Sequence, residues 1–197
     1  MKSRRLLAIH AWAATALPVL ANGFYVPVQA PEATARGNAW LATANTAAAV
    51  YYNAAGLAQL EEAEVVVGTY GIRLGIEAES AAGDYENDAT WTLLPQIYGA
   101  VPVNDKLVAG FGLNTPFGLA TDWGGATQFR QLAITTELEY LTGWLVTAYR
   151  LTDTLSLGGG LGIHHADMSL RRGLSPMPAT DFLEFNGDGQ AVSWTIS

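Results

Sequence analysis

The most constraining feature of this sequence is a period-two alternation of side-chain character that starts at Glu64 and recurs in several segments. Tight turns at 104–106 and 152–153 alternate with long polar stretches at 80–89 and 115–136. Because successive side chains of a strand point to opposite faces, this pattern predicts antiparallel β-strands joined alternately by short and long connections. The expected strands are 64–79, 90–103, 106–114, 137–151, 154–172 and 190–197, and a third long loop is expected at 171–189.

The composition indicates which solvent these strands face. Charged residues make up only 14% and hydrophobic residues 50% of the 197 residues, whereas a soluble domain has roughly 25% charged residues. After the N-terminal segment no apolar run reaches about 18 residues, so no transmembrane helix is predicted. We therefore expect an all-β fold, the N-terminal part of an antiparallel transmembrane β-barrel, because five or six strands with open edges cannot sit in lipid. A soluble β-sandwich is the alternative.

Several function classes are excluded or disfavoured. The net charge of −8 argues against nucleic-acid binding, and the absence of cysteine excludes thiolate sites and disulfides. Neighbouring His164 and His165 point to opposite faces of a strand, so they do not share a metal ion. The glycine run 158–162 lacks the lysine and the strand-to-helix context of a phosphate loop. With no supported Ser-His-Asp arrangement, we expect no enzyme, no cofactor and no metal.

The chain divides into three parts. Residues 1–21 have a basic start, an apolar stretch from Leu6 to Leu17 and small residues before Asn22, which predicts a cleaved signal peptide and export. Residues 22–62 are Ala-rich and mostly helical or coiled by pattern, with expected breaks at Gly37 and Asn53. Residues 63–197 form the partial barrel.

Four stretches, in this order, resemble one known family. They are "NGFYVPVQAPEATARGNAW", "YYNAAGLAQL", "LPQIYGAVPVNDKLVAGFGLNTPFGLATDW" and "LTGWLVTAYRLTDTLSLGGGLGIHHADMSL". They are similar to the FadL-like outer-membrane transporters of long-chain fatty acids and aromatic hydrocarbons, over nearly all of residues 22–170. One departure is Ala54, because the family motif has proline after the asparagine and so presets the backbone.

This resemblance implies a barrel of about 14 strands in the full protein, located in the bacterial outer membrane. It also implies that residues 22–62, which we call the hatch, plug the lumen of this barrel. It implies passive uptake of a hydrophobic molecule, a fatty acid or an aromatic hydrocarbon, which leaves sideways through a gap in the wall. The implied partners are that ligand, outer-membrane lipid with lipopolysaccharide, and the barrel-assembly machinery. A general porin, or a receptor or structural barrel, is the alternative, and an outer-membrane lipase is a weaker third.

The candidate residues follow from that resemblance and from the strand pattern. Asn53 and Gly56 are expected to turn the hatch toward the first strand, and Phe24 to reach the ligand site. Arg73 is expected on the lumen face, facing a ligand carboxylate or pairing with Glu77. If Tyr149 points outward, which we favour, two further ligand candidates point into the lumen, namely Tyr140 and Trp144. The expected kink and lateral opening of the third strand involves Gly112, Asn114, Pro116 and Gly118.

Overall fold

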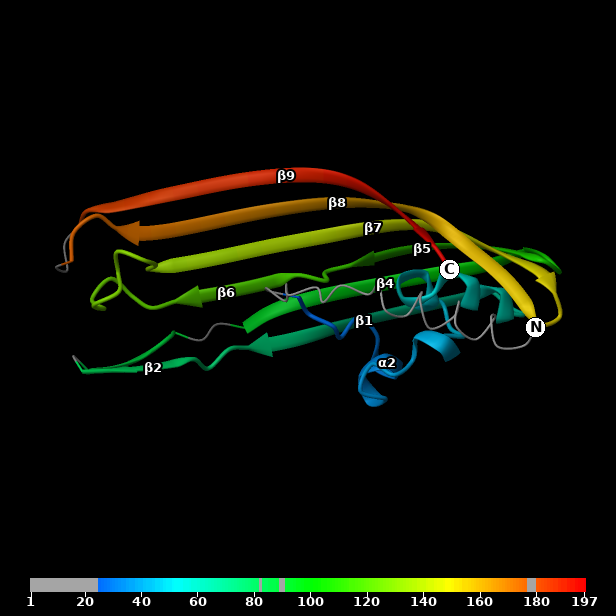
Figure 1. Cartoon of the computed structure of the whole chain (residues 1–197), viewed down its shortest axis with the longest axis horizontal. Helices are drawn as coiled ribbons and strands as arrows, with labels where there is room; N and C mark the ends of the chain where they lie inside the picture. The colour runs from blue at the N-terminus through cyan, green and yellow to red at the C-terminus, as the bar shows by residue number, and fades with distance from the viewer. Residues whose placement is uncertain (1–24, 82, 89–90, 177–179) are drawn as a thin grey trace, which may run out of the picture.

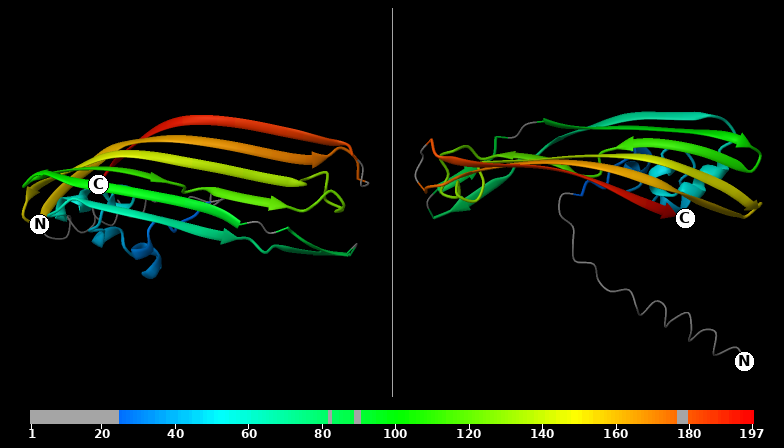
Figure 2. Two further views of the ribbon diagram at one scale, coloured as in Figure 1. Left: turned by 180° about the vertical axis from the view of Figure 1, so that it is seen from behind. Right: turned by 90° about the horizontal axis from the view of Figure 1, so that it is seen from above.

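The computed structural model of the chain describes residues 25–81, 83–88, 91–176 and 180–197. The expected signal peptide and Phe24 lie outside the described residues. The described part is a curved antiparallel sheet that arches over a group of short helices (Figure 1). The same arch is visible from behind and from above, with the helices on its concave side (Figure 2).

The sheet has the order β1-β4-β5-β7-β8-β9, and β6 pairs with β7 beside the end of β5. All pairs are antiparallel, and a separate hairpin is formed by β2 and β3. The strands are β1 (Glu64–Arg73), β2 (Glu77–Ser80), β3 (Gly83–Glu86), β4 (Trp91–Asn104), β5 (Leu107–Asn114), β6 (Gly118–Asp122), β7 (Thr135–Thr152), β8 (Leu155–Gly173) and β9 (Phe182–Ile196).

The predicted strands are therefore present, but the sheet extends into stretches that we expected to be loops. The hairpin of β2 and β3 occupies most of the expected loop 80–89, β6 lies within 115–136, and β9 begins inside 171–189. β7 and β8 contain 18 and 19 residues, more than the roughly 9–11 that a tilted strand needs to cross a bilayer. The polar ends of these two strands continue to pair with each other beyond the length that a bilayer requires.

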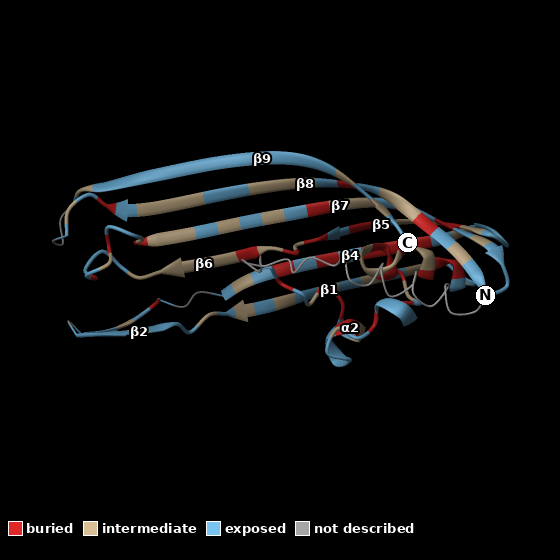
Figure 3. Cartoon of the chain, in the orientation of Figure 1, coloured by how far each residue is buried: buried red, intermediate tan, exposed pale blue. Residues whose placement is uncertain are grey.

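One face of the sheet is apolar and exposed, and we call it the outer face. The opposite, inner face carries the hatch and is buried where the hatch contacts β4, β5 and β7 (Figure 3). A lipid-facing strand of a barrel shows this distribution, because apolar side chains point outward and the lumen holds the rest. The exposed outer-face side chains include Leu93, Ile97, Val101, Phe111, Leu145, Leu157, Leu161, Ile163, Val192, Trp194 and Ile196.

The hatch folds into short helical turns rather than one helix. They are α2 (Pro31–Ala35), η1 (Leu41–Thr43), α3 (Ala49–Tyr52) and η2 (Ala54–Gln59). Gly37 and Asn38 both have positive φ, 60° and 65°, so the expected break at Gly37 is confirmed. The small alanine side chains let the turns pack closely around Trp40 and Leu57, which are fully buried. In the part of the chain that the structure describes, no helix is long and apolar enough to cross a membrane.

Glycines on the inner face make room for the hatch. A Cβ on Gly110 would come within 2.8 Å of the Val50 side chain and 2.9 Å of the Leu57 side chain. A Cβ on Gly158 would overlap the main chain of Ala55. The glycines of β5 and β8 therefore allow helix and sheet to approach more closely than any side chain would permit.

The predicted facing of the first strand is wrong. Val67 is 70% exposed on the outer face, whereas Tyr70 points inward and its hydroxyl lies 2.7 Å from the Thr34 hydroxyl of the hatch. By the alternation of β1, Arg73 therefore lies on the outer face rather than in the lumen. The reason is that Val65, Val66 and Val67 are apolar on both faces, so the pattern alone does not set which face meets the hatch.

Candidate functional site

The wall is interrupted between β5 and β6. β5 ends with Asn114 opposite Thr142 of β7, and β6 resumes with Gly118 opposite Glu139 of the same strand. Residues 115–117 between them make no ladder pairs with β7. One long strand is thus broken in its middle, within the expected kink region.

On the other side of this break, β4 continues with no hydrogen-bonded strand on the side that faces the break. Its ladder with β5 begins at Ile97, so residues 91–96 pair with β1 alone. Pro95 lies in this unpartnered part, where its missing N–H leaves no ladder bond unmade on that side. Between β4 and β6 the wall therefore lacks the continuous hydrogen bonding present elsewhere in the sheet.

A pocket of about 450 Å³ fills this interruption. Inner-face and outer-face residues both line it, so the pocket borders both faces of the wall. Apolar residues dominate at the break itself, and carboxylates lie toward the β7 and β8 ends. Lining residues of the inner face include Leu94, Phe117, Leu138 and Tyr140, and those of the outer face include Leu93, Leu141 and His165.

The N-terminal end of the hatch takes up the main-chain groups that the break leaves unpaired. The Val26 N–H donates to the Pro116 carbonyl over 2.8 Å, and Tyr25 forms an isolated antiparallel bridge with Phe117. The Thr115 carbonyl accepts a hydrogen bond of 3.1 Å from the Gln29 side chain. The hatch therefore replaces the missing strand neighbour at the kink.

Six aromatic rings connect the hatch, the break and the inner wall. Neighbouring centroids are 5.1 Å apart for Phe117 and Tyr140, 5.8 Å for Tyr140 and His164, and 5.7 Å for His164 and Trp144. On the hatch side, Tyr25 lies 5.5 Å from Phe117 and Tyr51 lies 6.4 Å from Trp144. Most of these contacts are edge-to-face, the arrangement that aromatic rings prefer. The inner surface beside the pocket is thus lined largely by aromatic rings.

The polar groups among these rings form hydrogen bonds with uncharged side chains. The indole N–H of Trp144 donates to the Asn114 Oδ1 over 3.1 Å, and the Asn114 amide donates to the Gln29 Oε1 over 2.9 Å. The two ring nitrogens of His164 lie 3.1 Å from the Thr142 hydroxyl and 2.7 Å from the Ser193 hydroxyl. Burial raises the pKa of Tyr52 in the hatch to about 12, so its hydroxyl stays neutral.

The hatch turn lies at the end of the inner face that carries the short turn between β7 and β8. The Asn53 side chain donates to the Leu41 carbonyl over 3.0 Å, and the Gly56 N–H donates to the Asn53 carbonyl over 2.8 Å. A Cβ on Gly56 would overlap the Ala44 carbonyl oxygen. Glycine is therefore required at this turn, which forms although Ala54 stands where proline is expected.

The structure brings some predicted site residues together and separates others. Tyr140 and Trp144 both lie on the inner face, and Tyr149 is exposed on the outer face, as favoured. Of the four kink residues, Pro116 lies in the unpaired stretch while Asn114 and Gly118 flank it.

The expectation that Gly112 interrupts the ladder is wrong. It pairs with Tyr98 on one side and Trp144 on the other. A Cβ there would lie 2.8 Å from Tyr98 and 3.0 Å from Val50, so this glycine makes room for the hatch.

Sequence reasoning missed Gln29, Tyr51, Phe117 and His164. For Phe117 the signal was present, since it lies between two residues named for the kink. For His164 the signal appears only once the register is known, because its partner Thr142 lies two residues from Trp144 along β7. Gln29 is a polar residue in a stretch of valine, alanine and proline with no periodic pattern that predicts its burial.

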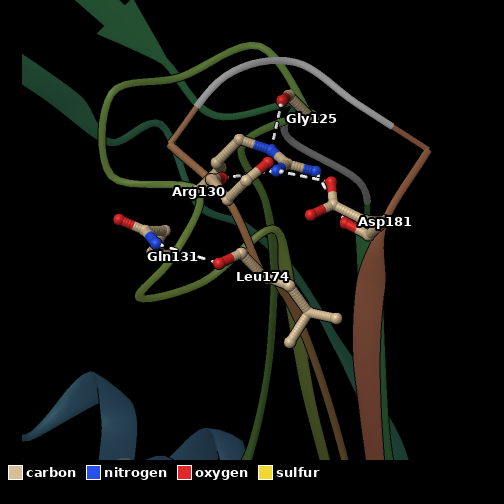
Figure 4. Close-up of polar contacts among 6 residues, drawn as sticks. Gly125, Arg130, Gln131, Leu174 and Asp181 are labelled. Atoms are coloured by element: carbon tan, nitrogen blue, oxygen red, sulfur yellow. Dashed lines mark hydrogen bonds and ion pairs between the residues drawn. The ribbon is translucent and has the colours of Figure 1, made fainter.

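The loop after β6 and the loop between β8 and β9 are held together by a buried arginine. Arg130, 1% exposed, donates to the Gly125 carbonyl over 2.9 Å and lies 3.2 Å from the Asp181 carboxylate (Figure 4). Beside it, the Gln131 side chain donates to the Leu174 carbonyl over 3.1 Å (Figure 4). The loop after β6 is therefore fastened to the loop between β8 and β9. Among the described residues, no group of three or more His, Asp or Glu side chains gathers as metal ligands would.

The model of the family described as "Outer membrane protein transport protein (OMPP1/FadL/TodX)" matches residues 12–196. The chain is 35% identical to "Putative outer membrane protein NMB0088" of Neisseria meningitidis serogroup B over 134 residues, which are 62% of this chain and 28% of that protein. It is 29% identical over 89 residues to "Long-chain fatty acid transport protein" of Salmonella typhi, covering 45% of this chain and 20% of that protein.

Two solved structures have the same fold. A Pseudomonas aeruginosa FadL homologue superimposes with a TM-score of 0.70 at 18% identity, covering 89% of this chain and 49% of the other. The P. putida toluene transporter TodX superimposes with a TM-score of 0.52 at 19% identity, covering 64% of this chain and 32% of the other. The chain thus spans about half the length of the first structure and less than a third of the curated relatives it matches.

Proposed function

Because the chain belongs to the outer membrane protein transport family, we propose that it forms part of a channel for the passive uptake of hydrophobic molecules. The family is one of outer-membrane transport proteins rather than of enzymes. The observation that carries the proposal is the pocket between β4 and β6, which is lined from both faces of the wall. A water-filled pore provides no favourable interaction for an apolar molecule. A route from the lumen into the bilayer, by contrast, lets the molecule avoid the aqueous periplasm.

In this proposal the hatch closes the lumen, and the aromatic rings beside the break form the ligand site. Burial of apolar ligand surface contributes about 25 cal/mol per Å², so rings such as Tyr140 and Trp144 retain a hydrophobic molecule long enough for it to reach the opening. The ligand then passes sideways between β4 and β6. Long-chain fatty acids and aromatic hydrocarbons both fit this surface chemically.

The test compares two substitutions in the intact outer-membrane protein reconstituted into vesicles. Gly118→Leu places a side chain at the break, where a Cβ would already lie 3.2 Å from Leu94. We expect uptake of radiolabelled oleate or toluene to fall by about tenfold. The matched control Thr147→Leu lies on the exposed outer face of the same wall and should leave uptake unchanged.

Two results would refute the proposal. One is equal uptake by the two variants when both are folded. The other is rapid entry of sugars into the same vesicles, measured by swelling, without uptake of either hydrophobic probe. The second result would instead assign a general porin.

A further inference from the structure

Gln29 is the most completely bonded buried side chain beside the proposed opening. It lies in the hatch just before α2 and is 1% exposed. Its side-chain amide donates to the Val26 carbonyl over 3.0 Å and to the Thr115 carbonyl over 3.1 Å. Its side-chain oxygen accepts from the Asn114 amide over 2.9 Å. Both amide hydrogens and the oxygen are therefore used, two of the three in contacts with the broken strand.

The main chain of Gln29 is held just as firmly. Its N–H donates to the Tyr52 hydroxyl over 2.9 Å, and its carbonyl accepts from the Tyr98 hydroxyl over 2.9 Å. Tyr98 belongs to β4, the strand on the far side of the opening, and Tyr52 belongs to α3 of the hatch. One residue thus connects the hatch core, β4 and the end of β5.

These contacts meet at the end of the opening where β4 and β5 separate. Asn114 is the last residue of β5, and Thr115, which follows it, lines the pocket. Tyr98 of β4 lies next to the last ladder pair of β4 with β5, and the β4 lining of the pocket begins three residues away at Pro95. The Gln29 hydrogen bonds therefore hold the start of the unpaired stretch 115–117 against β4 at the point where the ladder ends.

We infer that Gln29 is a positioning residue that sets the width of the lateral opening and so determines how bulky a hydrophobic molecule can leave. The inference rests on the proposed function of the opening. Without the Gln29 amide, the Thr115 carbonyl loses its partner, and a buried unpaired carbonyl favours a shift toward water. The stretch 115–117 then moves away from β4 and the opening widens.

The first measurement is amide hydrogen exchange, read by mass spectrometry on the intact protein in detergent micelles. Gln29→Met keeps the length of the side chain and removes its hydrogen bonds. We expect the Val26 amide, which donates to the Pro116 carbonyl, to exchange at least about tenfold faster, with no change along the paired β7–β8 ladder. Gln59→Met, an exposed hatch residue changed in the same way, should exchange as the wild type does.

The second measurement is the ratio of uptake of a bulky probe, a pyrene-labelled fatty acid, to that of a slim one, oleate. In Gln29→Met we expect this ratio to rise about fivefold, whereas simple destabilisation would lower both uptakes together. Asn114→Ala removes the hydrogen bond between the Asn114 amide and the Gln29 side-chain oxygen. If Gln29→Met fails to fold, Asn114→Ala should raise the same uptake ratio.

An unchanged ratio with unchanged exchange in a folded variant would overturn the inference. If the wild-type protein carries no hydrophobic probe at all, the proposed function fails. The exchange rates then still decide whether Gln29 holds the broken strand.

Discussion

Gly158 of β8 lies against the main chain of Ala55 in the hatch so closely that a Cβ on Gly158 would overlap the Ala55 nitrogen. The same Ala55 N–H donates to the Ser197 hydroxyl over 3.0 Å. Gly158, the first residue of the glycine run 158–162, is thus part of the surface on which the hatch sits.

This contact predicts that Gly158→Ala destabilises the folded protein by about 1–3 kcal/mol, because the hatch main chain has to move away from the wall. The measurement is the urea midpoint of unfolding from detergent micelles. Gly143→Ala serves as the control, since a Cβ there meets only ordinary contacts at 3.5 Å and 4.0 Å and should change the stability by less than about 0.5 kcal/mol. Equal midpoints for the two variants would contradict the close approach.

The facing of β1 predicts opposite environments for two neighbouring valines. Because the chain has no cysteine, Val66→Cys and Val67→Cys each carry a single label without background. A bimane label at position 67 should be quenched strongly by spin-labelled lipid, and one at position 66, which packs against the hatch, should not. The reverse result would restore the sequence-based orientation, with Arg73 in the lumen.

The ring contacts of Tyr140 predict a loss of ligand affinity without a loss of fold. Tyr140→Ala removes an edge-to-face contact with Phe117 and a tilted ring contact with His164, and aromatic pairs contribute about 0.5–1.5 kcal/mol each. We expect oleate or toluene to bind about tenfold more weakly, measured by titration calorimetry in micelles. Tyr149→Ala changes the same residue type on the outer face of the same strand and should bind as the wild type does.

The contacts of the buried Arg130 predict that the loop after β6 and the loop between β8 and β9 separate when the arginine charge is removed. Arg130→Met leaves the Gly125, Ser175 and Asp181 acceptors without their donor, and hydrogen bonds to a charged group contribute about 1.5–3 kcal/mol each. Limited proteolysis should then cut the loops 123–134 and 174–181 much faster than in the wild type. Cleavage at the wild-type rate would show that the arginine does not fasten them. Arg172→Met, an exposed arginine, provides the comparison.

The same contact predicts a dependence on acid. Desolvation raises the pKa of Asp181, but hydrogen bonds from Ser175 and Arg130 and the Arg130 charge outweigh it, so the pKa lies below its usual value. A lowered pKa in the folded state means that the carboxylate stabilises the loops above its ordinary pKa of about 3.9 and loses this effect as the pH falls below it. Loop mobility, followed by a spin label at position 128, should stay constant at neutral pH and rise only below about pH 4. A rise near pH 6 would point to another group.

Much of the fold was predictable because its signals are local. Strand positions follow from period-two alternation, and turns follow from short polar stretches such as 104–106, where the Asn104 side chain accepts from the Lys106 and Leu107 N–H groups, each at 3.0 Å. The resemblance to the family, confirmed by its match to residues 12–196, came from the same stretches. β6 was missed because five residues between loop-like stretches carry too little periodicity to stand out.

The sequence by itself determined where most of the long strands lie and that the sheet has one apolar face, because these properties depend on neighbours two or four residues away. Only the tertiary structure decided which face of β1 meets the hatch, since a shift of one residue exchanges the two faces and valines occupy both. It also decided the role of Gln29, which bonds to Thr115 across 86 residues of sequence. Such a contact depends on how the hatch packs under the broken strand, and no local pattern encodes it.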